Sequence, residues 1–388
     1  MTAYPEARPR VVISSGGVFH AYHMARGAEQ AGLLERFITR IYNRYETGIP
    51  RHKVRQAPLP WAIGYLISQL PGSRAAATAA YLSDTLFDRA ACRHLGTPDI
   101  FHVFNNYGYD SLPLARERGA ITIVERASAH PDVQAAILRE EYARHGLTYP
   151  DRYTRLNQRV VAEYDRADYI MVCSEFVRAT MRQAGIPADK LISIQLGFDP
   201  TRFQPGPKHD DVFRVLYAGA ISLQKGLPYL LEAFTQLALP NSELLLVGRP
   251  TPDAAGFLQR YAGHYRQRDF VPQADLVQFY QQASVFVLPS LQDGFGMVVY
   301  EAAACGLPVI VTEHVGAEIR DGIDGFRVPI RNSAALADRL RQLYEQPDLR
   351  AALGQAAYQY VQQFTWQRYH QQLTDIYHTL WNKKTHAG

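Results

Sequence analysis

Two carboxylates separated by seven residues flank a glycine-rich loop in the segment LQDGFGMVVYEAAACGLPVIVT, residues 291–312. Asp293 stands immediately before Gly294, and Glu301 lies among the small apolar residues that predict a buried helix from about residue 297. Carboxylate oxygens accept hydrogen bonds from hydroxyl groups, and backbone amides freed by glycines can donate to an anion. The alternative is a helix start at which the acidic side chains only favour the helix dipole.

A lysine at the start of a predicted helix is the second unusual feature. Lys225 lies near the end of the loop GAISLQKG, residues 219–226, which follows a predicted strand. A cation at a helix N-terminus opposes the dipole unless an anion lies between them, and a bound phosphate group would resolve that conflict. The loop lacks the Gly-Lys-Ser/Thr ending of a P-loop, so we do not expect nucleotide hydrolysis.

A third loop, SSGGVFH at residues 14–20, places Gly16 and Gly17 after the first predicted strand. Two glycines let a backbone approach a ligand closely, although such a pair is often only a tight turn. The loop does not form the pattern Gly-x-Gly-x-x-Gly, so a dinucleotide fingerprint is not supported. His20 and His23 are three residues apart, but a zinc site needs further ligands, and none is near in sequence.

Composition and length describe a globular protein of two domains. The chain has 388 residues, which exceeds one ordinary core, and it is 47% hydrophobic and 20% charged. Its three cysteines are far apart, which argues against a disulfide framework. The sequence shows neither an apolar run of roughly 18 to 20 residues nor a signal-peptide core, so we expect a cytoplasmic protein.

Apolar runs alternate with helical patterns along the chain, and a segment rich in proline and glycine at 196–211 divides the alternation into two units. Strands separated by helices imply parallel sheets, so the sequence predicts two doubly wound α/β units that face each other across a cleft. Strands are expected at 10–15, 36–41, 100–104, 120–125, 169–173, 191–195, 213–219, 243–248, 284–289 and 307–312, and helices at 18–32, 226–238, 253–264, from about 297, and at 333–345, 349–363 and 364–381.

Basic residues gather near the start of the chain. Residues 36–55 contain six Lys and Arg residues and only one acidic residue, Glu46, and the apolar stretch PWAIGYLISQL follows at 60–70. Each cation near an anionic membrane contributes about 1 kcal/mol to binding. The basic 36–55 region therefore predicts peripheral contact with the inner face of an anionic membrane, with a solvated loop and a core helix as the alternative. No nucleic-acid partner is expected.

At this level of detail the chain resembles a known enzyme family. The segment PSLQDGFGMVVYEAAACGLPVIVT is similar to the E-x7-E segment of the retaining glycosyltransferases of family 4, which have the GT-B fold. The resemblance continues through YAGAISLQKGLPYLLEAF, GAEIRDGIDGFRVP and the tail FTWQRYHQQL. It implies a Rossmann-like acceptor-side domain at 1–197, a Rossmann-like nucleotide-sugar-binding domain at 198–365, and a crossover helix at 366–388 that packs on the first domain.

The resemblance also implies roles for individual residues. Glu301 matches the acid that binds the nucleotide ribose, and Asp293 stands where glutamate usually contacts the donor sugar. Lys225 matches the lysine that binds the diphosphate. His130, in ERASAHP after the strand at 120–125, resembles the histidine that contacts the transferred sugar; its alternative is a loop histidine bonded to backbone. Backbone amides for the sugar or diphosphate would come from Gly16, Gly17, Gly294, Phe295, Gly296 and Met297.

Two further donor contacts are expected at positions that the family's motifs do not settle. Ala220 stands where many members carry an arginine, so Arg249 at the end of the next strand is the candidate to share the diphosphate charge. Base contacts in this fold are often made by backbone, and Val271 is the candidate for them.

The implied function is a retaining, metal-independent transfer of a sugar from a nucleoside diphosphate donor to a hydroxyl group. The acceptor would be a glycan, lipid-linked or small molecule, as in cell-surface polysaccharide or glycolipid biosynthesis. The sequence contains no Asp-x-Asp, which favours catalysis without a bound cation. The alternatives are a binding or scaffold protein that has kept the fold, and a nucleotide-sugar epimerase.

Overall fold

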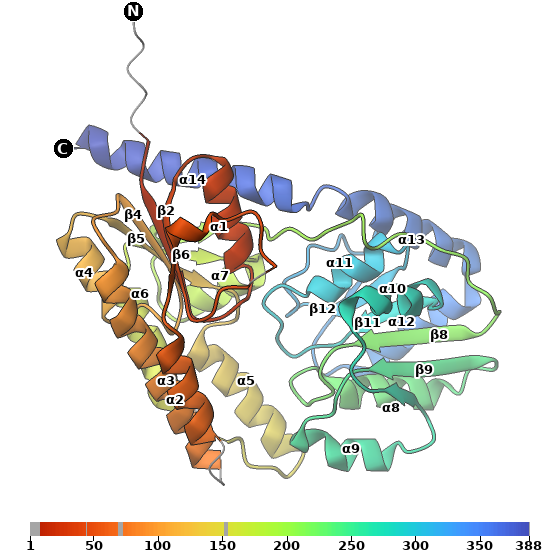
Figure 1. The fold of residues 1–388 in the computed structure, drawn as a ribbon. Helices are drawn as coiled ribbons and strands as arrows, with labels where there is room; N and C mark the ends of the chain where they lie inside the picture. The colour runs from red at the N-terminus through yellow and green to blue at the C-terminus, as the bar shows by residue number, and fades with distance from the viewer. Residues whose placement is uncertain (1–7, 44, 69–72, 151–153, 388) are drawn as a thin grey trace, which may run out of the picture.

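The first domain is built on a seven-stranded parallel sheet (Figure 1). The computed structural model describes residues 8–43, 45–68, 73–150 and 154–387. The strand order is β3-β2-β1-β4-β5-β6-β7, and every residue of β1 and of β5 is buried, as expected for strands covered on both faces. The strands are β1 (Val11–Ser15), β2 (Leu34–Thr39), β3 (Val54–Gln56), β4 (Ile100–Phe104), β5 (Ile121–Arg126), β6 (Tyr169–Val172) and β7 (Leu191–Ser193).

The second domain repeats this design with six parallel strands in the order β10-β9-β8-β11-β12-β13. These strands are β8 (Phe213–Ala218), β9 (Ser242–Val247), β10 (Arg266–Arg268), β11 (Val285–Leu288), β12 (Val309–Thr312) and β13 (Gly325–Val328). The two-sheet architecture confirms the predicted pair of doubly wound units.

Helices follow most strands, as the crossover connection of a parallel sheet requires. Those of the first domain are α1 (Ala21–Gln30), α2 (Pro58–Ser68), α3 (Ser73–His94), α4 (Ser111–Glu117), α5 (Pro131–Arg144), α6 (Thr154–Arg166) and α7 (Glu175–Gln183). Those that follow are α8 (Leu227–Leu237), α9 (Ala255–Arg260), α10 (Gln273–Gln281), α11 (Met297–Ala304), α12 (Ser333–Glu345), α13 (Pro347–Val361) and α14 (Trp366–Ala387).

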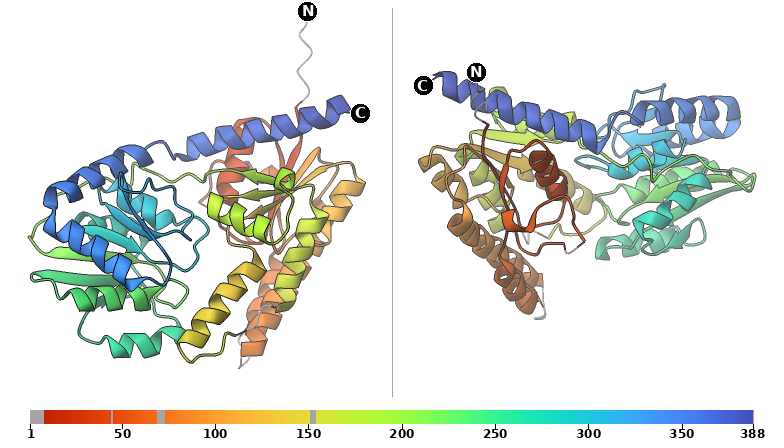
Figure 2. Two further views of the ribbon diagram at one scale, coloured as in Figure 1. Left: turned by 180° about the vertical axis from the view of Figure 1, so that it is seen from behind. Right: turned by 45° about the horizontal axis from the view of Figure 1, so that its top comes forward.

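The last helix returns to the first domain. In both views of Figure 2, α14 lies along the first domain, and it packs against α1. The His23 ring of α1 stacks on Trp366 of α14 with a centroid separation of 3.5 Å. The linker that leads into the second domain runs beside the returning segment, because Phe198 N donates to Phe364 O. The predicted crossover helix is therefore confirmed, and it begins at Trp366.

The first strand of each sheet marks the place where a ligand is expected. β1 lies between β2 and β4, and β8 lies between β9 and β11, so the winding direction reverses beside both strands. Open α/β sheets bind ligands beyond the carboxyl ends of strands at such switch points. The loops after β1, β8 and β11 occupy these ends, and they are the three loops that the sequence analysis identified.

Some predicted elements differ from the structure. The helix expected at 253–264 is only six residues long as α9, and a strand, β10, and another helix, α10, follow it before β11. β10 consists of Arg-Gln-Arg at the edge of its sheet, so it lacks the apolar run by which the other strands were recognised. β3 and β13 were also missed, because their segments, Val-Arg-Gln and Gly-Phe-Arg-Val, lack a continuous apolar run.

The basic region at 36–55 is partly neutralised within the fold. Arg40 pairs with Asp84, and Lys53 Nζ lies 2.6 Å from Glu29 Oε2. These pairs offset part of the positive charge of the region. No helix among the described residues is both long and apolar enough to cross a membrane.

Candidate functional site

The loops after β8 and β11 meet through an ion pair. Lys225 Nζ donates to Asp293 Oδ2 over 2.6 Å, and both side chains are about one fifth exposed, at 22% and 17%. Asp293 Oδ1 accepts from the backbone amide of Gly296 at 3.0 Å, so the carboxylate is held on both sides. Only Gly226 separates Lys225 from the start of α8, and Asp293 supplies an anion beside the lysine. The ammonium group has three donors, so it can bind a further anion while it keeps Asp293.

Glu301 lies in the second turn of α11 and is buried, with 2% of its surface exposed. Its Oε1 accepts from Gln273 Nε2 at 2.6 Å, and its Oε2 accepts from the Tyr280 hydroxyl at 3.0 Å. Burial raises the pKa of Glu301, and these two hydrogen bonds oppose that shift. Each oxygen retains a second lone-pair direction, so the carboxylate can accept hydrogen bonds from a ligand as well.

The predicted contacts to the base and diphosphate lie on the loops that precede α9 and α10. Val271 is half-buried against the core, two residues before Gln273, the residue that binds Glu301. Arg249 is exposed just beyond β9, and its guanidinium lies 5.4 Å from the Phe270 ring centroid. Val271 and Glu301 are thus brought together through Gln273. Arg249 stacks on the residue next to Val271.

The glycine-rich loop leads into the N-terminus of α11. Phe295 is buried and stacks on Tyr300 with a centroid separation of 4.9 Å, so its side chain anchors the loop to the core. Met297 is the first residue of α11. The first amides of a helix have no acceptor within that helix and favour an anion. The loop therefore brings backbone donors and the Lys225 ammonium to the same side of the second domain.

Gly294 is one point at which the second domain contacts the first. Its carbonyl oxygen accepts from Ser174 Oγ at 2.6 Å and from Cys173 Sγ at 3.3 Å. A Cβ atom at position 294 would lie 2.0 Å from the carbonyl oxygen of Ala127, which is far inside van der Waals contact. Only glycine permits this approach of the two domains.

His130 lies three residues after Ala127 and caps α5. Its Nδ1 accepts from the amide of Asp132 at 3.3 Å, and its own amide donates to Thr180 Oγ1. The ring is 2% exposed, and burial lowers the pKa of His130. Because Nδ1 accepts, the proton of the neutral ring is on Nε2, which makes Nε2 a donor. His130 can therefore bond to the backbone through Nδ1 and contact a ligand through Nε2 at the same time, because the two interactions use different ring nitrogens.

The loop with Gly16 and Gly17 lies against the loop after β4. A Cβ atom on Gly16 would lie 2.6 Å from the Tyr107 ring, and Ser15 Oγ donates to the Gly17 carbonyl at 2.8 Å. Glu163 holds the second loop, because the amides of residues 106 and 108 donate to its carboxyl at 2.8 and 3.0 Å. Glu163 is fully buried, and burial raises its pKa to about 8.

Of the two histidines near this loop, His20 is buried in the first domain and His23 is half-buried against α14. His20 Nε2 lies 2.9 Å from the buried Glu125 Oε1, and His23 stacks on Trp366. Glu125 also pairs with His102 at 3.1 Å. Although burial alone would raise the pKa of Glu125, these two histidines lower it to about 2. Across the described ranges, no three metal-ligating side chains of His, Cys, Asp or Glu form a possible ion site.

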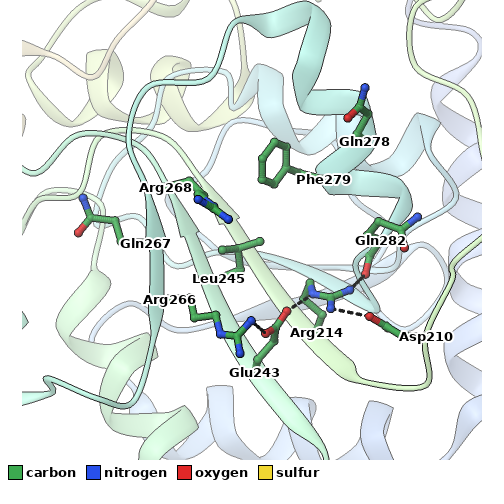
Figure 3. A pocket seen from close by; sticks show the side chains of 10 residues that line it. All are labelled: Asp210, Arg214, Glu243, Leu245, Arg266, Gln267, Arg268, Gln278, Phe279 and Gln282. Carbon is green, nitrogen blue, oxygen red and sulfur yellow. Dashed lines mark hydrogen bonds and ion pairs between the residues drawn. The ribbon is translucent and has the colours of Figure 1, made fainter.

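A separate pocket lies at the other end of the second sheet (Figure 3). Arg214 and Glu243, the second residues of β8 and β9, line it together with Arg266, the first residue of β10. Arg214 is held inside the protein, where it pairs with Asp210 and Glu243. As far as the structure describes the chain, the lining residues include none of the predicted donor residues.

Sequence reasoning missed several residues of the site. Gln273 and Tyr280 were missed because α10 was not predicted. Ser174 and Ala127 contact Gly294 from the first domain. A signal for Ser174 was present, since it directly follows the strand and Cys173 and stands before a helical pattern as its N-cap.

Comparisons with known proteins identify relatives of this chain. The family described as glycosyl transferases group 1 matches residues 212–346. A D-inositol 3-phosphate glycosyltransferase of Saccharomonospora viridis is 30% identical over 294 residues, which cover 68% of this chain and 66% of the relative. The corresponding enzyme of Actinosynnema mirum is 29% identical over 359 residues, which cover 84% of this chain and 82% of the relative.

The fold has a close counterpart among solved structures. Sucrose-phosphate synthase from Thermosynechococcus elongatus superposes with a TM-score of 0.74 at 21% identity, and the match covers 97% of this chain and 100% of that one. The paired Rossmann-like domains, the returning helix and the similarity to group 1 enzymes together identify the chain as a glycosyltransferase of the group 1 family with the GT-B fold.

Proposed function

We propose that this glycosyltransferase moves a sugar from a nucleoside diphosphate donor to a hydroxyl group with retention of configuration and without a bound metal. The observation that carries the proposal is the cluster on the second domain. There the Lys225–Asp293 pair, the N-terminus of α11 and the buried Glu301 converge at the carboxyl ends of neighbouring strands. Cationic, amide and carboxylate groups in one place match the diphosphate and hydroxyl groups of a sugar nucleotide.

Each part of the donor has a candidate partner. Glu301 accepts hydrogen bonds from the ribose hydroxyls, and the backbone at Val271 contacts the base. Lys225, Arg249 and the backbone of Gly16 and Gly17 surround the diphosphate. Asp293 accepts a hydrogen bond from a hydroxyl of the sugar, while the amides of Gly294 and Met297 face the sugar and its phosphate. The amides of Phe295 and Gly296 donate to Asp293 Oδ1 and hold that carboxylate in place. Support for this order comes from the place of Gln273, which joins the Val271 loop to Glu301.

The reaction we propose takes place on one face of the sugar. The bond between the anomeric carbon and the diphosphate oxygen breaks, and the acceptor oxygen forms its bond on the same face. The leaving diphosphate takes the acceptor proton, and Lys225 with the loop amides stabilises its developing negative charge. His130 Nε2 donates a hydrogen bond to the sugar from the first domain. The contact between Ser174 and Gly294 brings the domains together and excludes water.

Donor identity and metal independence can be tested directly. Thermal unfolding is measured with a panel of nucleotide sugars, since a ligand that binds only the folded protein raises its stability. The stabilising donor is then incubated with lipid-linked and soluble acceptors, and NMR gives the anomeric configuration of the product. Retention with activity undiminished by EDTA supports the proposal. Inversion, or activity that EDTA removes and magnesium restores, contradicts it.

Contact with an anionic membrane is also part of the proposal. On α2, Leu59 and Leu66 are 69% and 68% exposed, and Arg51 precedes them on the surface. Figure 1 shows α2 and α3 as a pair of helices that extends away from the sheet. A basic segment that is followed in the chain by exposed apolar side chains fits a lipid surface that carries anionic head groups.

The membrane contact has its own test and control. The wild-type protein should float with phosphatidylglycerol vesicles. The variant in which Leu59 and Leu66 are both changed to Asp should no longer do so. The control is Ile323→Asp, which alters an apolar side chain of 52% exposure on the second domain. Equal flotation of both variants contradicts the contact.

A further inference from the structure

A second contact between the domains is built around a buried carboxylate. Glu141 lies on α5 of the first domain and has no exposed surface. The Tyr229 hydroxyl of α8 donates to its two oxygens at 2.9 and 3.0 Å, and Arg331 Nε donates to Oε2 at 2.7 Å. Both partners belong to the second domain. We call Glu141, Tyr229 and Arg331 the clasp.

Arg331 makes more than one contact across the domain boundary. Its Nη2 donates to the Ile137 carbonyl at 2.9 Å, and its Nη1 lies 3.1 Å from Glu140 Oε2. The side chain is only 14% exposed, and its backbone has φ of +59°, which is uncommon for a residue with a side chain. A residue keeps such an unfavourable backbone conformation only where its surrounding contacts stabilise it. The contacts of Arg331 with Glu140, Glu141 and Ile137 therefore fix the direction of its guanidinium group.

The clasp needs both domains. Within the first domain, the Glu141 carboxylate forms a hydrogen bond with His145, whose Nε2 lies 3.1 Å from Glu141 Oε1. Separation of the domains would remove Tyr229 and Arg331 from the carboxylate and leave its charge poorly compensated. Burial, and then the neighbouring Glu141, raise the pKa of Tyr229, which keeps its hydroxyl protonated as a donor. The contact therefore favours the arrangement in which the two domains touch.

The two helices joined by the clasp also carry two residues of the proposed reaction. α5 has His130 at its N-cap, eleven residues before Glu141, which corresponds to about 16 Å along a helix. α8 starts directly after Lys225 and Gly226, and Tyr229 is its third residue. A fixed contact between α5 and α8 thus limits how far His130 and Lys225 can move relative to each other.

We infer that Glu141, Tyr229 and Arg331 are positioning residues, which hold His130 of the first domain and Lys225 of the second in register for glycosyl transfer. The inference rests on the proposed function for the roles of His130 and Lys225. None of the three residues needs to touch the substrate. Loss of the clasp should slow the chemical step, because reacting groups that are misplaced by about 1 Å can lose 100-fold in rate.

Two variants and two matched controls test the clasp in the full-length protein. Tyr229→Phe removes one hydroxyl, and Arg331→Ala removes the guanidinium group. Tyr344→Phe removes a hydroxyl that bonds to Pro240 within the second domain, and Arg341→Ala removes an arginine that pairs with Asp338 of its own helix. The unfolding midpoint of each variant shows whether it is folded. If Arg331→Ala lowers the stability of the protein, Tyr229→Phe tests the same contact with a smaller change.

Small-angle X-ray scattering gives a readout that does not depend on activity. Arg331→Ala should increase the radius of gyration of the free protein, and Tyr229→Phe should do so less, while the controls match the wild type. Kinetics with the stabilising nucleotide sugar should show kcat reduced about 10-fold or more in Arg331→Ala, with donor KM changed less than about twofold. Folded clasp variants with wild-type scattering and wild-type kcat overturn the inference. Failure of every donor to react would refute the proposed function, and scattering would still decide the clasp.

Discussion

Lys225 Nζ lies 2.6 Å from Asp293 Oδ2, so the loops after β8 and β11 are joined by a charge-assisted hydrogen bond. The sequence indicated that the lysine needs an anion beside its helix, and Asp293 provides one. The pair remains partly exposed and keeps donor capacity for a diphosphate. In this arrangement Asp293 orients the lysine, and the proposed function also assigns it a contact with the sugar.

Replacement of Lys225 tests the charge at the leaving group. Lys225→Ala should lower kcat about 100- to 1000-fold, as does loss of one donor that stabilises transition-state charge. Lys208→Ala is the control, because Lys208 pairs with Asp210 at the far end of the second domain. Initial rates with the stabilising donor measure the effect. Near-wild-type rates for Lys225→Ala would exclude the lysine from the reaction.

Glu301 should determine donor affinity and its pH dependence. Glu301→Gln should weaken donor binding by about 1.5–3 kcal/mol, the contribution of a hydrogen bond to a charged group. Because burial raises the pKa of Glu301, the carboxylate becomes protonated at a higher pH than usual, and donor affinity should fall as the pH drops through that value. Calorimetric titration at several pH values measures both effects.

The control for Glu301 is Glu313→Gln, which changes an exposed acidic residue in the loop after β12. It should bind the donor with wild-type affinity at every pH. A Glu301→Gln protein that keeps the wild-type pH dependence would show that another group titrates.

The approach of the domains can be blocked at one atom. Gly294→Ala places a Cβ atom against the Ala127 carbonyl, so the donor loop must move away from the first domain. Transfer should fall strongly, while the donor still binds to the second domain. Gly256→Ala is the control, since a Cβ atom there would have no heavy atom of the described structure within 4 Å, apart from its chain neighbours and the backbone of its own helix. Equal transfer by both variants would argue against a role for this contact.

Glu163 should make stability depend on pH. Its pKa is about 8 in the folded protein and 4.5 as an ordinary carboxyl group, so between these values the folded protein binds the extra proton. The stabilising contribution is complete below pH 4.5 and is lost as the pH rises through 8. Denaturant unfolding at pH 5 and pH 8 should therefore show a larger loss of stability in the wild type than in Glu163→Gln. An identical loss in both proteins would assign the dependence to other groups.

Much of the architecture could be predicted because it is local. Strands such as 100–104 are continuous apolar runs, and the loops with Lys225 and Asp293 follow strands that lie side by side. Their meeting follows from the topology of parallel sheets. β10 escaped prediction because its three residues are polar, and α10 with Tyr280 was lost with it.

The contacts between the domains could not be predicted in the same way. Ser174 and Gly294 are 120 residues apart, and Tyr229 and Glu141 are 88 apart. Each contact depends on how the two domains are placed relative to each other. The periodic patterns of the sequence contain no information about that placement. The residue types did not predict the burial of Glu141 either, since the surrounding sequence REEYARHG is typical of an exposed helix.

The most direct test of the donor site is a crystal structure of the protein with its stabilising nucleotide sugar. We expect ribose hydroxyls within hydrogen-bond distance of the Glu301 carboxylate and a phosphate oxygen within the same distance of Lys225 Nζ. A donor bound elsewhere, for example in the pocket lined by Arg214 and Arg266, with Lys225 and Glu301 untouched, would contradict it.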